Sequence, residues 1–177
     1  NFLGYKSVIR TRNNTSRSGK IDVAIYTEHN SIDVPLCAIE VKGFNPSKPL
    51  IIKDLERNAE YFDLKSRTGD STLPFAVFIA LHSYKGVWND KKEQSNLSKV
   101  KKRYQSYIDD NKNLNSLSQC VDVFTIRRGV LPDPNDPHIQ EHGLQGDEDY
   151  LFIGAVVTTK KNLTSQSTRT QKNCAGV

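Results

Sequence analysis

Three charged side chains, Asp22, Glu40 and Lys42, stand in otherwise apolar segments with the pattern of β-strands. Side chains alternate between the two faces of a strand, so Glu40 and Lys42 project to the same side, about 7 Å apart. A buried charge is costly unless it is paired or binds a metal. If the two segments pair, Asp22 can join the other two. Such a set could hold a hydrated divalent cation and stabilise negative charge on a phosphate ester.

Two strands and a helix must position these side chains. The sequence predicts strands over Lys20–Thr27 and Pro35–Lys42, joined by a polar turn over Glu28–Asp33. The prolines and glycine of the segment 43–49 end the second strand. An apolar stripe at helical spacing then predicts a helix from Leu50 to Arg67.

The pattern Asp or Glu, any residue, Lys is by itself weak evidence for a functional site. It occurs four times, and three of the copies lie in polar or helix-like stretches: Asp63/Lys65, Asp90/Lys92 and Asp110/Lys112. Residues two apart on a helix do not face each other, so these copies cannot converge. Only the copy at Glu40 lies in an apolar strand. A surface strand with a Glu–Lys pair and a solvated Asp22 remains the alternative interpretation.

Asp22, followed after seventeen residues by Glu40-Val41-Lys42, resembles the signature of the PD-(D/E)XK nuclease superfamily. Gly19-Lys20-Ile21-Asp22 stands in place of the Pro-Asp dipeptide, and the resemblance covers roughly residues 1–83, with a weaker continuation to 127. It implies an α/β protein with a restriction-endonuclease-like mixed β-sheet flanked by helices.

The resemblance also implies an activity, namely hydrolysis of phosphodiester bonds by a Mg²⁺-dependent endonuclease, with DNA favoured over RNA. The metal ligands would be Asp22, Glu40 and the backbone carbonyl of Val41, with Mn²⁺ as a substitute for Mg²⁺. Lys42 would complete the catalytic set by orienting the attacking water or stabilising developing negative charge.

Basic residues on two predicted helices are candidates for contacts with nucleic acid. Lys53 and Arg57 follow the strand of Glu40, where the resemblance implies a phosphate contact. Lys99, Lys102 and Arg103 lie in a helix predicted from about Leu97 to Asn113. Cations near a helix start oppose its dipole, which favours an external anion. Solvated helix faces, with Asp54 and Glu56 as partners on the first helix, remain the alternative.

The rest of the chain completes one sheet. We expect strands over 1–12, 75–83, 120–127 and 150–159, the first extending the hairpin into a three-stranded meander. Phe75–Ser83 is continuously apolar, which predicts a central strand buried on both faces with a parallel neighbour. His82 is interpreted as structural. His138 and His142, near Glu141, form a weak metal candidate because no further ligand pair supports them.

Composition sets the broad class. The 177 residues are 36% hydrophobic and 25% charged, with a net charge of +5, which is compatible with a polyanionic partner. We expect one domain over 1–159 and a polar tail over 160–177. No apolar run of membrane-spanning length and no signal peptide is recognised, and the three cysteines are interpreted as reduced thiols of a cytoplasmic protein.

Two expectations concern partners. Because the chain begins at Asn1 and contains no methionine, we expect the natural start to lie upstream, in a larger protein. Restriction-type cutting of both DNA strands usually needs a dimer, so a homodimer is a further expectation from the resemblance. The alternative function is a non-catalytic nucleic-acid-binding or protein-interaction domain with the same fold.

Overall fold

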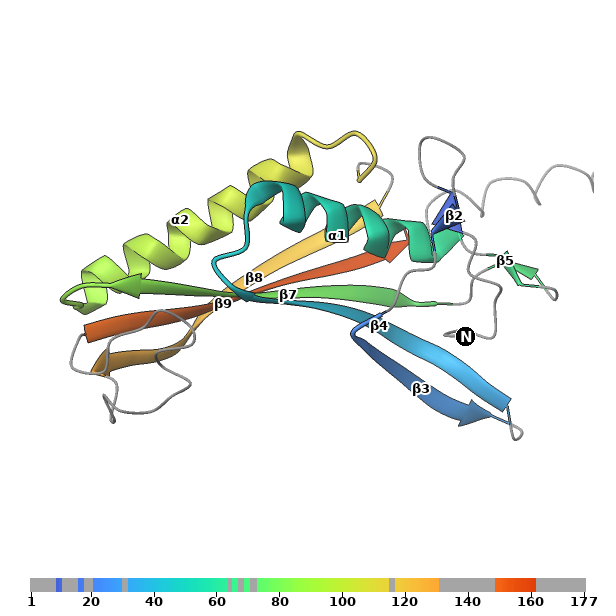
Figure 1. The fold of residues 1–177 in the computed structure, drawn as a ribbon, viewed down its shortest axis with the longest axis horizontal. Helices are drawn as coiled ribbons and strands as arrows, with labels where there is room; N and C mark the ends of the chain where they lie inside the picture. Colours follow the sequence, from blue (N-terminus) through green and yellow to red (C-terminus); the bar gives the residue numbers. More distant parts are fainter. Residues whose placement is uncertain are drawn as a thin grey trace, which may run out of the picture.

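The computed structural model describes residues 9–10, 16–17, 21–29, 32–63, 65–66, 69–70, 73–114, 117–130 and 149–161. A five-stranded mixed sheet in the order β3-β4-β7-β9-β8 forms its centre, and two helices cover one face of this sheet (Figure 1). The elements of this layer are β3 (Val23–His29), β4 (Ile32–Phe44), α1 (Lys48–Glu60), the 3₁₀ turn η2 (Tyr61–Asp63), β7 (Phe75–Lys85), α2 (Asp90–Asp109), β8 (Leu117–Val130) and β9 (Asp149–Lys161). The chain is therefore an α/β protein.

Strand directions follow from the connections. β4 and β7 are parallel neighbours joined through α1, and the other three strand pairs are antiparallel. The predicted central position of the segment 75–83 and its parallel neighbour are thus confirmed. α1 begins two residues before the predicted start, with Pro49 in its first turn. Proline is tolerated there because the first backbone N–H groups of a helix have no intrahelical partner.

Two apolar clusters fill the space between the helices and the sheet. The larger contains Leu55, Phe78, Tyr104 and Ile153, and the smaller contains Tyr61, Phe62 and Leu73 with Ala38 and Ala76. A third, small cluster consists of Tyr150 and Phe152, with Phe44 packed against them. Burial along β7 alternates between full and partial, so the prediction that this strand is buried on both faces was wrong. β9 is the strand with consecutive buried residues, from Tyr150 to Ala155.

Several predicted boundaries were wrong: strands extend further into polar residues than expected, and one helix ends earlier. The predicted turn over 28–33 is mostly strand, since β3 reaches His29 and β4 starts at Ile32. The predicted helix to Arg67 ends at Glu60 and continues only as η2. Lys160 and Lys161 belong to β9 rather than to the tail.

The first strand of the predicted meander is also placed differently. Two short ladders lie outside the five-stranded sheet: β1 (Ile9–Arg10) with β2 (Ser16–Arg17), and β5 (Lys65–Ser66) with β6 (Gly69–Asp70). Within the described ranges, the segment 1–12 therefore contributes no strand to the main sheet. The two histidines of the weak metal candidate and the residues after 161 lie outside the described residues.

An asparagine joins the end of β4 to β7. Asn45 has a φ of 52°, the left-handed region in which asparagine is enriched. Its backbone N–H donates to the Leu81 carbonyl at 2.8 Å, its Nδ2 donates to Ser83 Oγ at 3.0 Å, and its Oδ1 accepts from the Ser83 N–H at 3.1 Å. These bonds fix the point from which the chain turns towards α1.

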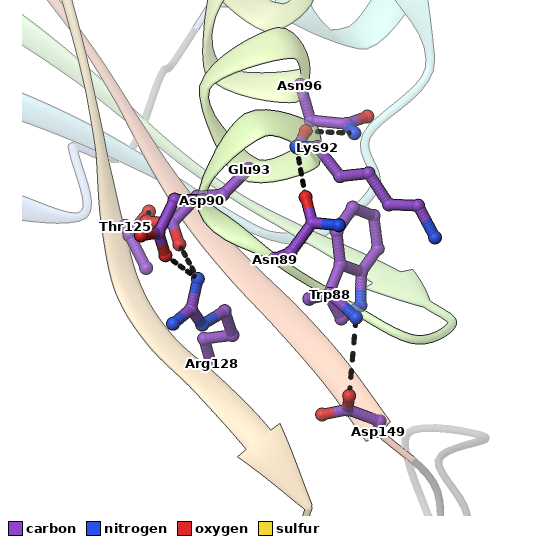
Figure 2. Close-up of polar contacts among 9 residues, drawn as sticks. All are labelled: Trp88, Asn89, Asp90, Lys92, Glu93, Asn96, Thr125, Arg128 and Asp149. Atoms are coloured by element: carbon purple, nitrogen blue, oxygen red, sulfur yellow. Dashed lines mark hydrogen bonds and ion pairs between the residues drawn. The ribbon is translucent and has the colours of Figure 1, made fainter.

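The start of α2 is attached to β8 by a charged network (Figure 2). Arg128 Nη1 contacts Asp90 Oδ1 at 2.7 Å and Glu93 Oε2 at 2.9 Å, and the Thr125 hydroxyl donates to Glu93 Oε1. Asn89 caps the helix, its Oδ1 accepting from the Lys92 N–H at 2.9 Å. Because α2 starts at Asp90 rather than Leu97, its first two turns are polar. None of the helices in the described ranges is long and apolar enough to cross a membrane.

Candidate active site

The start of β3 brings Asp22 beside Glu40. Val23 pairs with Ile39 and Ala24 with Ala38, so continuing this register places Asp22 opposite Glu40. One carboxylate oxygen of Asp22, Oδ2, accepts a hydrogen bond from the Val41 backbone N–H at 2.8 Å. Asp22 is exposed to solvent, whereas Glu40 is fully buried. The two carboxylates are therefore neighbours at the helix-covered side of the sheet, one in solvent and one in the core.

Glu40 is held by two donors from the helical layer. Its Oε2 accepts from Arg57 Nη1 at 2.9 Å and its Oε1 from the Tyr61 hydroxyl at 2.5 Å. Burial raises the pKa of Glu40, and the charge of Asp22 adds to this, although Tyr61 and Arg57 oppose the shift. Burial likewise raises the pKa of Tyr61. The tyrosine is therefore a neutral donor to this carboxylate.

Lys42 lies on the same face of β4 and has a partner of its own. Its Nζ is 2.8 Å from Asp54 Oδ2, and Asp54 Oδ1 is 3.3 Å from Arg57 Nη2. Arg57 therefore bridges two buried carboxylates, and Glu40 raises its pKa against the opposing effect of burial. Glu40, Arg57, Asp54 and Lys42 alternate in charge and sum to zero. We call these four residues, together with Asp22 and Tyr61, the site cluster. Asp22 gives the site cluster one net negative charge.

Helical spacing explains how α1 supplies these partners. Asp54 and Tyr61 lie seven residues apart, which places them on one face of the helical layer. Lys42 contacts the earlier of the two and Glu40 the later, so α1 runs antiparallel to β4. The sequence predicts Asp54 only as a surface partner and does not single out Tyr61. The available signal was a polar residue within the apolar stripe of Ile51, Leu55 and Phe62.

The predicted nucleic-acid contacts are dispersed. Arg57 points into the site cluster instead of towards solvent, while Lys53, Lys99 and Lys102 are exposed. Arg103 is half-buried, and its Nη2 donates to the Tyr84 hydroxyl at 3.3 Å.

The prediction that Lys99, Lys102 and Arg103 lie near the start of their helix was wrong. Lys99 and Lys102 lie in the middle of the helix, and the first turn carries Asp90 and Glu93. These acidic residues suit the positive end of the dipole.

The donor chemistry at Asp22 and Glu40 fits a hard cation. In the described part of the chain, no group of three or more His, Cys, Asp or Glu side chains is placed to hold a metal ion. Mg²⁺, however, needs only one or two carboxylates, because it keeps several waters. Each Glu40 oxygen carries one hydrogen bond and retains a further lone pair, and Asp22 faces solvent.

The His82 prediction concerned a structural role, and its surroundings match that role. His82 is buried, and its Nε2 lies 2.9 Å from the Tyr104 hydroxyl. Burial lowers the pKa of His82 to about 4, so the imidazole is neutral near pH 7.

Comparison with known proteins gives no match: no family model, no curated protein and no solved structure is similar to this chain.

Proposed function

We propose that this chain is a metal-dependent nuclease with a restriction-endonuclease-like sheet, which hydrolyses phosphodiester bonds in DNA. One observation carries the proposal. The start of β3 sets Asp22 beside Glu40, and Lys42 lies on the same face of β4. Two carboxylates and a lysine at one point of a sheet are what a cation-assisted attack on a phosphodiester needs.

Each residue of the site cluster has a role in this proposal. Asp22, Glu40 and the Val41 carbonyl would hold Mg²⁺, or Mn²⁺ in its place. The bound cation would supply an activated water and offset charge on the phosphate. Lys42, whose side chain is 28% exposed, is accessible to a phosphate and stabilises negative charge there.

The helical layer supports these groups. Asp54 orients the Lys42 ammonium group, and Arg57 with Tyr61 orients the Glu40 carboxylate and offsets its burial. Exposed cations outside the site cluster, such as Lys53, Lys99 and Lys102, would bind the DNA backbone. The net charge of +5 favours such a polyanionic partner.

The test is plasmid cleavage in Mg²⁺ and in Mn²⁺ by the full chain and by Asp22→Asn and Lys42→Met. Removing a group that stabilises transition-state charge typically costs about 10²-fold or more in rate, and we expect losses of this size in both variants. Asp122→Asn and Lys161→Met, on exposed positions of β8 and β9, are matched controls and should cleave normally. Full activity in both site variants, with unfolding curves like wild type, would exclude the proposal.

A second function is favoured by the engagement of the same side chains within the protein. Both Glu40 oxygens and the Lys42 amine already have partners. A non-catalytic nucleic-acid-binding domain would bind DNA in a salt-dependent way and cleave nothing in either metal. Absence of binding even at low salt would favour a protein-interaction domain.

A further inference from the structure

In the described part of the chain, five residues have buried side-chain atoms without a hydrogen-bond partner. Asp54 Oδ2 is one of these atoms, but it is ion-paired with Lys42, and Trp88 Nε1 lies beside the start of α2. The other three residues are Asn58 on α1, Gln119 on β8 and Thr159 on β9. Five of their polar atoms are involved: Asn58 Nδ2 and Oδ1, Gln119 Nε2 and Oε1, and Thr159 Oγ1. Leaving a buried donor or acceptor unpaired costs free energy, and proteins rarely tolerate several together. Something must therefore bond to these atoms.

Strand register brings two of the three together. Ala38 pairs with Ala76, Ala76 with Thr159, and Thr159 with Gln119. These four residues form one row across β4, β7, β9 and β8. Ala38, Ala76 and Thr159 are fully buried on the helix-covered face. We call this set the Ala38–Gln119 row.

Helical spacing places Asn58 on the side of α1 that faces the two clusters of this region. It is three residues after Leu55 and four before Phe62, so the three share one side of the helical layer. Leu55 belongs to the larger apolar cluster, whose sheet residues include Phe78 from the adjacent row. Phe62 belongs to the smaller cluster with Ala38 and Ala76, which Leu117 of β8 extends. The unpaired amide thus lies at the boundary of the two clusters.

The side chains of this row are small. Ala38 and Ala76 are smaller than Phe78 and Val157 of the adjacent row, and Tyr61, Phe62 and Leu73 pack against them. A buried water needs two to four polar partners, and five polar atoms would serve about two waters. Water is favoured over an apolar guest because the unpaired atoms include both donors and acceptors.

We propose that ordered water molecules occupy the boundary between the two core clusters, bound by Asn58, Gln119 and Thr159. This hydration site lies on the inner side of the sheet, one row from Glu40. It would join α1 to the two strands β8 and β9. The inference is independent of nuclease activity.

A high-resolution crystal structure of the full chain tests it. We expect water density within hydrogen-bond distance of at least two of the three side chains. Thr159→Val keeps the side-chain shape, and we expect it to lose at least one of these waters. Thr158→Val, on the opposite face of the same strand, is the matched control and should lose none. Direct bonds among the three side chains, dry packing, or density for a different molecule would each overturn the proposal.

A solution measurement complements the crystal. The side-chain amide protons of Asn58 and Gln119 should show NMR cross-peaks to long-lived water, whereas exposed Gln105 should exchange rapidly with bulk solvent. In Thr159→Val the cross-peak of Gln119 should weaken or disappear. Unchanged cross-peaks in Thr159→Val, or none in wild type, would contradict the assignment.

Discussion

Two networks, each with an arginine that bridges two carboxylates, occupy different environments in this protein. In the site cluster, Arg57 bridges the carboxylates of Glu40 and Asp54 while the Tyr61 hydroxyl donates to one of them. At the start of α2, Arg128 bridges Asp90 and Glu93 while the Thr125 hydroxyl donates to one of them. Figure 2 shows the second network. Each contains an arginine, two carboxylates and a hydroxyl.

The two networks differ in burial. The Glu40 and Asp54 side chains are 1% and 2% exposed, whereas Asp90 is 93% exposed. Water screens the exposed network, which therefore contributes little to stability. The buried network must compensate its own desolvation through its internal bonds. The proposed function gives a reason for a network with such a desolvation cost beside Asp22.

Removing the bridging arginine should give the largest difference in stability loss between the two networks. Arg57→Ala leaves Glu40 and Asp54 buried without their common cation, and we expect the free energy of unfolding to fall by roughly 3–5 kcal/mol. Arg128→Ala should leave it nearly unchanged, because solvent replaces the arginine. Urea unfolding at pH 7 measures both. Equal losses in the two variants would show that burial does not govern the difference.

Removing the hydroxyls should give a smaller contrast. Tyr61→Phe removes one donor from a buried carboxylate, and we expect a loss of about 1–3 kcal/mol in the free energy of unfolding. Thr125→Val should cost less, since Glu93 keeps Arg128 and partial access to solvent. The measurement is again urea unfolding. A larger loss for the threonine than for the tyrosine would reverse the comparison.

The pH dependence of stability should show the smallest effect. Burial raises the folded-state pKa of Glu40 above its ordinary value of 4.5, so the folded protein binds this proton more tightly than the unfolded chain. The stability linked to this proton is present below pH 4.5 and is lost as pH rises through the folded-state pKa. Wild type should therefore lose stability relative to Glu40→Gln as pH rises from 4.5. Glu93→Gln supplies the baseline, and a difference that grows in the opposite direction would contradict the assignment.

Strand alternation was sufficient to predict which residues of β4 share a face. Glu40 and Lys42 are charges within an apolar run, and the two-residue period of a strand places them together whatever the rest of the fold. The central strand was equally accessible from its apolar run. The position of Asp22 opposite Glu40 depends on how the two strands pair. The sequence shows only that Asp22 would lie there if the strands pair in this register.

The partners from α1 were harder to predict. A polar residue in an apolar stripe, such as Asp54, can face solvent or a buried ion, and only the packing of α1 on β4 decides between these. The start of α2 was missed because apolar spacing begins at Leu97. The capping residue Asn89 and the acidic Asp90 and Glu93 were the available signals.

Asn45, which is hydrogen-bonded to β7, is connected to the start of α1 by a very short linker. Only Pro46 and Ser47 separate it from Lys48, so the first turn of α1 cannot slide along β4 without breaking the bonds to Ser83. The hydrogen bonds between Asn45 and Ser83 therefore help to align Asp54 on α1 with Lys42 on β4. An uncharged side chain outside the site cluster thus contributes to the geometry of its charged residues.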